Sequence, residues 1–290
     1  MRWQMGRRSE NIEDRRGMSP GMGRGIRVGG AGGLGILAIA LVAMFLGVDP
    51  SIILNSIPGD VGGSQSDVAP RSAPAPGDTG AEFVSAVLAQ TEDTWTDIFA
   101  QAGQQYQDPQ LVLFDGSVQS ACGMAASATG PFYCPGDRKV YLDLSFFREL
   151  QERFGASGDF ADAYVIAHEV GHHVQTLLGT SEQVTRARSQ ADQATANELS
   201  VRLELQADCY AGIWARHMQE RQGVVEDGDI EEALGAASAV GDDRIQKATR
   251  GYVVPESFTH GTAQQRMRWF KQGLQTNDPN SCDTFGADRL

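Results

Sequence analysis

One uncharged segment divides the sequence: Val28–Val48, which reads VGGAGGLGILAIALVAMFLGV. A helix of this length, rising about 1.5 Å per residue, spans the hydrocarbon core of a bilayer. Residues 1–28 carry seven Arg and three acidic residues, a net charge of +4, whereas the rest of the chain has a net charge of −17. The positive-inside rule therefore predicts a single-pass protein of the cell membrane, with a cytoplasmic basic head (1–27), an anchor (28–48) and an exported body.

Two other interpretations of this segment remain open. As a cleaved signal peptide it would have an unusually long basic head, and no clear small-x-small cleavage site follows it. As a buried core helix it would need an amphipathic partner, and no nearby stretch has that pattern.

Beyond the anchor, residues 49–80 are dominated by Pro, Gly, Ser, Asp and Ala, which predicts a disordered tether. The remaining residues, 81–290, are long enough to bury a core and form the predicted globular domain. Because the whole chain carries a net charge of −13, nucleic acid is not an expected partner. The sequence leaves the oligomeric state open.

Periodicity in the body predicts an α+β fold that is mostly helical and has a small sheet. Short β-prone runs bounded by turn residues predict strands at Leu111–Phe114 and Arg138–Leu142. Apolar residues at helical spacing predict helices over 81–103, 143–154, 159–178, 181–222 (as one helix or two), 229–240 and 262–274, the last with Thr262 as its N-cap.

All four cysteines lie in the body, and an even number in an exported region predicts two disulfides. Three pairings are possible. We favour Cys122 with Cys134, which closes a short Gly- and Pro-rich loop, and Cys209 with Cys282. The alternatives are four free thiols or a four-cysteine zinc site, and the second lacks the usual C-x2-C spacing.

The predicted helix over 159–178 contains the sequence His168-Glu169-Val170-Gly171-His172. Histidines four residues apart lie on one helix face, so that both imidazoles can reach a single Zn²⁺. Glu169 can then reach a water at the metal, which is the H-E-x-x-H arrangement of a metal hydrolase. The alternative is a pair of core histidines satisfied by hydrogen bonds.

A catalytic zinc site needs a third protein ligand and one open position, and Glu204 is the best candidate. It lies on a helix with many inward-facing apolar residues, where a carboxylate is costly unless it meets positive charge. Asp208, one turn later, can accept a hydrogen bond from the free ring nitrogen of a ligating histidine. Glu198 is the rival ligand, and a solvated helix face is the alternative for the pair.

These motifs resemble the bacterial neutral zinc metallopeptidases, a membrane-anchored family of gluzincin-like proteins. The resemblance rests on the segments AHEVGHHVQ (167–175), ELQADCYAG (204–212) and THGT (259–262), with Arg266, Trp269 and Phe270, and on GPFYCP (130–135) followed by KVYLD (139–143). It covers nearly the whole chain and implies a zincin-like domain, one Zn²⁺ per chain and a peptide or protein substrate.

The residue types predict a zinc metalloendopeptidase. Zinc would lower the pKa of a water and polarise the scissile carbonyl, and Glu169 would act as general base. His260, in a loop before a helix, is the candidate for stabilising the oxyanion. The alternatives for His260 are a structural loop histidine and a fourth ligand that keeps the site latent.

Four side predictions concern the remaining candidates. We expect His173 to face away from the metal, His217 to be exposed and Arg266 to pair with a carboxylate. Residues 138–143 could form an edge strand that receives an extended peptide, or an ordinary sheet strand. For the whole protein, the alternatives to a peptidase are a non-peptidase amide hydrolase and a membrane-anchored scaffold that binds zinc.

Overall fold

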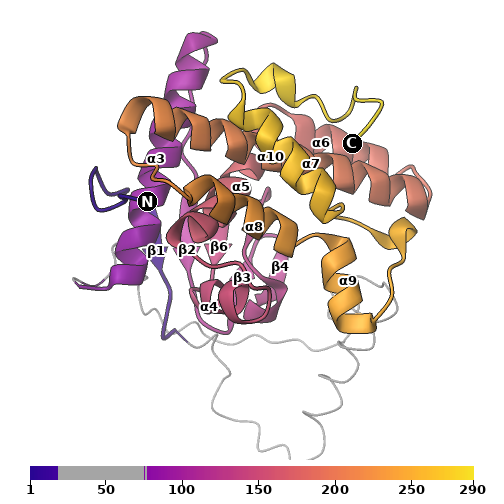
Figure 1. The fold of residues 1–290 in the computed structure, drawn as a ribbon, viewed down its shortest axis with the longest axis horizontal. Helices are drawn as coiled ribbons and strands as arrows, with labels where there is room; N and C mark the ends of the chain where they lie inside the picture. Colours follow the sequence, from indigo (N-terminus) through magenta and orange to yellow (C-terminus); the bar gives the residue numbers. More distant parts are fainter. Residues whose placement is uncertain (19–74, 76) are drawn as a thin grey trace, which may run out of the picture.

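The computed structural model describes residues 1–18, 75 and 77–290 of the chain. Their fold is α+β and mostly helical, with helices layered over one small sheet (Figure 1). The helices are α3 (Thr79–Gln101), α4 (Ser145–Glu152), α5 (Asp159–Leu177), α6 (Thr180–Arg188), α7 (Gln193–His217), α8 (Asp229–Ala239), α9 (Asp242–Arg250) and α10 (Ala263–Leu274), and a π-helical turn, Met218–Gln222, extends α7.

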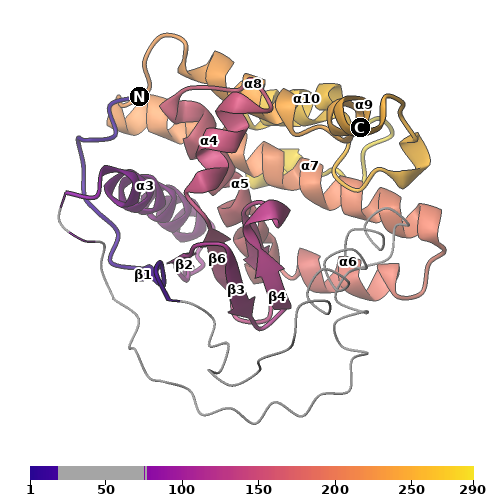
Figure 2. The ribbon, with the colours of Figure 1, turned by 90° about the horizontal axis from the view of Figure 1, so that it is seen from below.

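The main sheet has four strands in the order β1-β2-β6-β5. The strands β1 (Ile12–Asp14), β2 (Gln110–Leu113) and β6 (Lys139–Leu142) are parallel, and β5 (Phe132–Cys134) is antiparallel to β6. A separate antiparallel hairpin is formed by β3 (Ser117–Ser120) and β4 (Gly123–Ala126). Figure 2 shows α3 and α5 lying next to this sheet, with α7, α8 and α10 on the far side of α5.

Helix α5 is the centre of the structure, because it contacts α3, α7, α8 and strand β5. Fourteen of its residues are buried, including the apolar run 163–167 that precedes the first histidine of the H-E-x-x-H motif. The helices α7 and α10 make the most extensive contact of any pair in the described chain. The buried middle of α5 is therefore packed between these neighbouring elements.

Two glycines allow the helices around α5 to approach closely. A Cβ atom on Gly171 would lie 3.0 Å from the carbonyl oxygen of Ala207 in α7, and one on Gly273 would lie 1.8 Å from the carbonyl oxygen of Cys209. The first contact brings α7 against the H-E-x-x-H motif, and the second brings α10 against α7. Larger residues at either position would separate the helices that supply the site.

Most elements predicted in the body are confirmed within one to three residues, and Thr262 caps α10 with a full capping box. The predicted stretch over 181–222 divides into α6, α7 and the π-turn. The predictions did not include β1, β3, β4, β5 or α9. The expected anchor (28–48) and nearly all of the expected tether lie outside the described residues. Among the residues that are described, no helix combines the length and the apolar character needed to cross a bilayer.

Residues 1–18, which we call the N-terminal arm, lie against the body, although the sequence predicted a separate head. Ile12, in β1, is 1% exposed and pairs with Leu111 of β2. Trp3 packs edge-to-face on Phe83 of α3, with their ring centroids 5.6 Å apart. The arm is therefore part of the sheet and of the main core cluster.

Candidate metal centre

Three polar residues of α5 gather in its otherwise apolar middle. His168 is 6% exposed and Glu169 is 8% exposed. The rings of His168 and His172 lie with their centroids 4.8 Å apart, one helical turn from each other. The helix therefore presents both imidazoles on one face, as the spacing predicted.

Glu204 of α7 lies opposite both imidazoles. Its Oε2 is 3.1 Å from Nε2 of His168, and its Oε1 is 3.4 Å from Nε2 of His172. One donor atom from each of the three side chains lies within 4.8 Å of the others. The structure thus brings together the three residues proposed from the sequence as metal ligands.

The remaining ring nitrogen of each histidine already has a partner. Nδ1 of His168 lies 2.9 Å from Oδ1 of Asp208, and Nδ1 of His172 lies 2.8 Å from Oε1 of Gln175. Since both partners are acceptors, each Nδ1 carries a proton, and Nε2, which faces Glu204, is the nitrogen that would give up its proton to a metal ion. The sequence analysis anticipated Asp208 but not Gln175.

Asp208 is the centre of a fully buried network. Its carboxylate accepts hydrogen bonds from Nε and Nη2 of Arg266 in α10, at 2.8 and 2.9 Å, and from the hydroxyl of Tyr164. Burial raises the pKa of Asp208, but the charges of Arg266 and His168 outweigh it and lower the pKa. Asp208 therefore stays ionised and orients the ring of His168, while Arg266 balances its charge, the pairing expected for that residue.

The electrostatic field of the site favours positive charge. Burial lowers the pKa of His168, but the carboxylates of Asp208 and Glu204 outweigh this and raise it to about 9. Glu204 has a pKa held well below its usual range by His172 and His168, although burial opposes this. A site that stabilises charge on its imidazoles is also suited to a divalent cation.

The third acidic side chain, Glu169, differs from Glu204. Burial raises its pKa, and the neighbouring charges of His168 and His172 only partly oppose this. A raised pKa brings a carboxylate closer to the range in which it can both take up and release a proton near neutral pH.

His260 lies in the loop before α10, its side chain is 52% exposed, and Glu204 is among the charges that act on it. Its Nδ1 is 3.2 Å from Oδ1 of Asp242, and Oδ2 of that carboxylate accepts hydrogen bonds from the backbone N–H groups of Thr259, His260 and Gly261 at 2.7–3.0 Å. Desolvation lowers the pKa of His260, but Asp242 and Glu204 outweigh it and raise the pKa. The sequence analysis missed Asp242, whose position at the start of α9 resembles an ordinary helix terminus.

Three other expectations are corrected or decided by the structure. The strand within 138–143 is not an edge, because β6 lies between β2 and β5. His217 is 4% exposed rather than exposed, and its Nδ1 lies 3.1 Å from the hydroxyl of Thr94. Glu198, the rival ligand, has a side chain that is 59% exposed and pairs with Arg202, away from the histidines.

His173 points away from the candidate site, as expected. It is buried between Tyr106 and Tyr133, and its Nε2 donates to the carbonyl oxygen of Gln107 at 2.6 Å. Burial lowers its pKa to about 4, so the ring is neutral and serves the packing of α5 against the sheet.

Both predicted disulfides are present. Cys122 pairs with Cys134 across a sequence separation of 12, next to β5, and Cys209 pairs with Cys282 across a separation of 73. Cys209 follows Asp208 directly in α7, so the second bond ties the C-terminal segment to the helix that carries Glu204.

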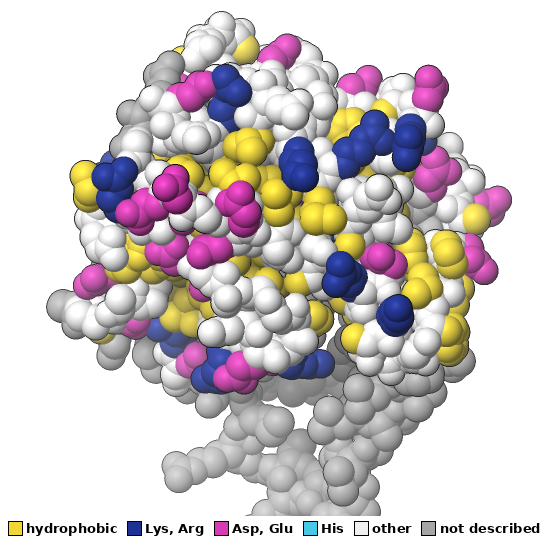
Figure 3. Space-filling view, in the orientation of Figure 1, with side chains coloured by type: hydrophobic (Ala, Val, Ile, Leu, Met, Phe, Trp, Pro, Cys, Tyr) yellow, Lys and Arg dark blue, Asp and Glu magenta, His cyan; other side chains and the backbone are white. Residues whose placement is uncertain are grey.

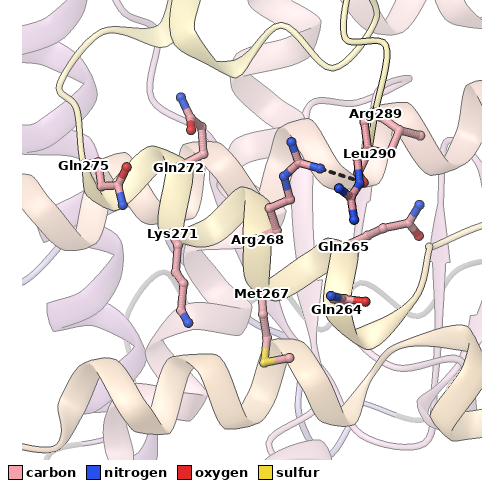
Figure 4. A pocket seen from close by; sticks show the side chains of 9 residues that line it. All are labelled: Gln264, Gln265, Met267, Arg268, Lys271, Gln272, Gln275, Arg289 and Leu290. Atoms are coloured by element: carbon pink, nitrogen blue, oxygen red, sulfur yellow. Dashed lines mark hydrogen bonds between the residues drawn. The ribbon is translucent and has the colours of Figure 1, made fainter.

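A surface cavity of about 520 Å³ lies on the opposite side of α10 from Arg266. Its lining includes the basic residues Arg268, Lys271 and Arg289, and Arg268 donates to the backbone oxygen of Leu290 at 3.1 Å (Figure 4). Figure 3 shows Lys and Arg side chains gathered on the face where α10 and the C-terminus meet. None of the candidate site residues lines this cavity.

The donor atoms fit zinc. Two imidazole Nε2 atoms and one ionised carboxylate form the ligand set of a catalytic zinc site that leaves one position open. An acceptor holds each Nδ1–H, so Nε2 is the nitrogen of each ring that would bind the ion. His168, His172 and Glu204 would hold the ion.

Comparisons with known proteins agree with this chemistry. A family model described as "Putative neutral zinc metallopeptidase" matches residues 1–285. The chain is 51% identical to the protein YpfJ of Escherichia coli K12 over 290 residues, 99% of each chain. It is 46% identical to Rv2575 of Mycobacterium tuberculosis H37Rv over 261 residues, 86% of each chain. No solved structure matches it. A match over nearly the whole chain, together with two close relatives, shows that this protein belongs to the neutral zinc metallopeptidase family.

Proposed function

We propose that the protein is a zinc metalloendopeptidase that hydrolyses peptide bonds in peptide or protein substrates. The observation that carries the proposal is the convergence of His168, His172 and Glu204 within 4.8 Å, with a separate buried carboxylate, Glu169, beside them. A site that only holds zinc as a structural element has no use for that fourth group.

Zinc in such a site supplies Lewis acidity, which activates a water and polarises a carbonyl group. The chain's own residues then have distinct tasks. Glu169 accepts a proton from the attacking water and returns it to the leaving amine, which its raised pKa favours. Asp208 and Gln175 hold the two imidazoles in orientation.

His260 would stabilise the oxyanion. Its Nδ1 and backbone N–H both face Asp242, which leaves Nε2 free of this pair and available to donate. The charges of Asp242 and Glu204 raise the pKa of His260 and so favour the protonated form, which is the better donor. In this proposal Asp242 is a positioning residue that acts through His260.

The two disulfides support a location of the domain outside the cytoplasm, where such bonds persist. Attachment to the cell membrane through residues 28–48 is a further part of the proposal, and its support is the uncharged segment itself.

The test separates metal binding from chemistry. We expect the purified full chain to contain about one Zn²⁺ per molecule and to cleave an unfolded protein substrate, with activity lost in chelator. Glu169→Gln should retain the zinc and the melting temperature but lose activity by roughly 100-fold or more, because an amide cannot accept the proton. Full activity of this variant would refute the general-base role, and zinc without any peptidase activity in the wild type would favour a scaffold.

A further inference from the structure

The two candidate histidine ligands are oriented by partners of different kinds. His168 faces the carboxylate of Asp208, whose charge is balanced by Arg266. His172 instead faces the side-chain amide of Gln175, which is fully buried and carries no charge. A side-chain amide has an acceptor at one end and a donor at the other, so its orientation decides which of them it offers to the ring.

A chain of hydrogen bonds fixes the orientation of Gln175. Its Nε2 donates to the backbone oxygen of Leu203 at 2.7 Å and to Oε1 of Gln206 at 3.0 Å. The Nε2 of Gln206 in turn donates to the backbone oxygen of Cys282 at 3.1 Å. We call the two glutamines and these contacts the amide relay.

The direction of every bond in the amide relay follows from the backbone oxygens that it reaches. Those of Leu203 and Cys282 can only accept hydrogen bonds, so both glutamines must turn their NH2 groups towards them. The Oε1 of Gln175 is then left facing His172, at 2.8 Å from Nδ1. Reversing either amide would place two oxygen atoms at hydrogen-bond distance without a proton between them. Nδ1 of His172 therefore keeps its proton, and Nε2 is the nitrogen that can bind a metal ion.

The amide relay also joins the two helices that supply the candidate ligands. Both glutamines are buried, with Gln175 0% and Gln206 7% exposed. Leu203 directly precedes Glu204 in α7, and Gln206 lies two residues after it. Gln175 therefore ties the helix that carries His172 to the part of α7 that carries Glu204.

The far end of the amide relay is fixed by a covalent bond. Cys282 forms the disulfide with Cys209, so the backbone oxygen that receives Gln206 belongs to a segment tied to α7. The same segment is also held by the hydroxyl of Thr284, which donates to the backbone oxygen of Arg202 in α7 at 2.7 Å. The C-terminal segment thus presents a fixed acceptor to Gln206.

From these contacts we infer that Gln206 is a positioning residue of the candidate metal site, which acts through Gln175 to hold the ring of His172 in the orientation and tautomer that a metal ion needs. Its own hydrogen bonds go to Gln175 and Cys282. Because both amides are neutral, the amide relay fixes the ring without adding negative charge to the site. The inference rests on the metal centre of the proposed function, but not on the reaction proposed there.

The experiment measures the zinc affinity of the full chain, by competition with a chelator, in Gln175→Met, Gln206→Met and the double variant. Methionine has the length of glutamine but cannot donate a hydrogen bond and is only a weak acceptor. We expect Gln175→Met to weaken zinc binding by about 10- to 100-fold, the range for partners of ligating histidines, and Gln206→Met by about tenfold. The double variant should bind zinc as Gln175→Met does, within about twofold, because both changes interrupt the same relay.

A merely structural role for Gln206 gives a different result. Its replacement would then lower the free energy of unfolding of the metal-free protein, while the zinc affinity would stay unchanged or the two losses of affinity would multiply in the double variant. Either outcome for the zinc affinity would overturn the inference. The matched control is Gln90→Met, which removes a buried amide of α3 whose Oε1 has no hydrogen-bond partner in the described structure. It should leave the zinc affinity unchanged.

The wild type provides a second measurement, which does not require any variant to fold. The NH2 protons of Gln175 and Gln206, observed by NMR, should exchange with solvent at least about tenfold more slowly than those of the exposed Gln183 in α6. Equal exchange rates would overturn the amide relay. Zinc bound without peptidase activity would refute the proposed function and leave this inference standing, whereas unchanged zinc affinity in Gln206→Met would refute this inference alone.

Discussion

Two acidic clusters lie along helix α5, and they differ in what they can bind. At the start of the helix, Asp159 joins Asp229 and Glu232 in a group whose carboxylate oxygens lie within 4.8 Å of one another, a limit that the group at the middle of the helix also meets. The first cluster contains only carboxylates, and the chain's own ammonium group lies among them. An ammonium group has no lone pair, so it balances charge but cannot ligate a metal.

The second cluster contains two imidazoles, and an imidazole that gives up its Nε2 proton has a lone pair for a metal ion. In this cluster Glu204 faces His168 and His172, and the fixed charge of Arg266 lies behind Asp208, not among the candidate ligands. The comparison shows that a cluster of carboxylates is not by itself a metal site. Whether a cluster can bind an ion depends on the tautomer of its histidines and on the position of the nearest permanent cation. Where that cation lies within the cluster, it already balances the negative charge.

The largest expected effect concerns the third ligand. Glu204→Ala should reduce zinc content from about one per chain to near zero and abolish peptidase activity, because two imidazoles alone are an incomplete set. The matched control is Glu198→Ala on the same helix, whose exposed pair with Arg202 should contribute at most about 1 kcal/mol. If Glu204→Ala retained its zinc, Glu204 would not be the third ligand, and the contrast between the two clusters would fail.

The second largest expected effect concerns the disulfide that ties α7 to the C-terminal segment. Loss of the bond between Cys209 and Cys282 opens a long loop and should destabilise the fold by up to about 4 kcal/mol, compared with about 3 kcal/mol for Cys122–Cys134, by the chain-entropy estimate. Cys282→Ser should also weaken zinc binding, because the helix that carries Glu204 is less constrained. Chemical denaturation and zinc titration of Cys282→Ser and Cys122→Ser measure both effects. Equal losses of stability and of zinc affinity in the two variants would contradict the special role of the longer bridge.

The smallest effect is a pH dependence confined to the first cluster. Burial lowers the folded pKa of the Met1 amine, but the carboxylates of Asp159 and Asp229 outweigh it and raise the pKa above its ordinary value of 8.0. The stability it contributes is therefore fully present below pH 8 and is lost as the pH rises through the folded pKa. The melting temperature of the wild type should exceed that of Asp229→Asn by most below pH 8, and the gap should narrow above it.

The charged groups around this amine are known, so the sign can be checked. The raised pKa of Asp162 also makes the fold less stable as the pH rises from its ordinary value of 3.8 towards about 7, but this loss is complete below pH 8 and occurs in both proteins. If the difference in melting temperature instead widened above pH 8, the amine could not be its source. The groups that face or neighbour the amine are Asp159, Asp162, Arg2, Glu226, Asp229 and Glu232.

Much of the candidate site could be predicted from the sequence because its parts are local. His168 and His172 share a face by helical periodicity alone, and Glu204 and Asp208 share another. Asp242 could not be predicted, because it reaches His260 from 18 residues away and begins an otherwise polar, unremarked helix. Gln175 was missed because an amide beside a histidine has no distinctive pattern.

The same difference between local and distant contacts decided which parts of the fold could be predicted. Long helices such as α3 and α5 have a strong apolar period, and they were predicted well. Strand β1 has only three residues, two of them acidic, and its partner β2 lies about a hundred residues later. The order of strands in the sheet also depends on such distant pairing, which is why the sequence could not decide whether residues 138–143 form an edge strand or an ordinary sheet strand.

The position of the N-terminal arm also determines a sequence of events in time. The arm is synthesised before the body, yet the carboxylates that contact the Met1 nitrogen follow it by 158 and 228 residues. The N-terminal arm therefore cannot complete its contacts until α5 and α8 have been synthesised. During synthesis, full protection of the arm from protease should therefore appear only after α8 has been made.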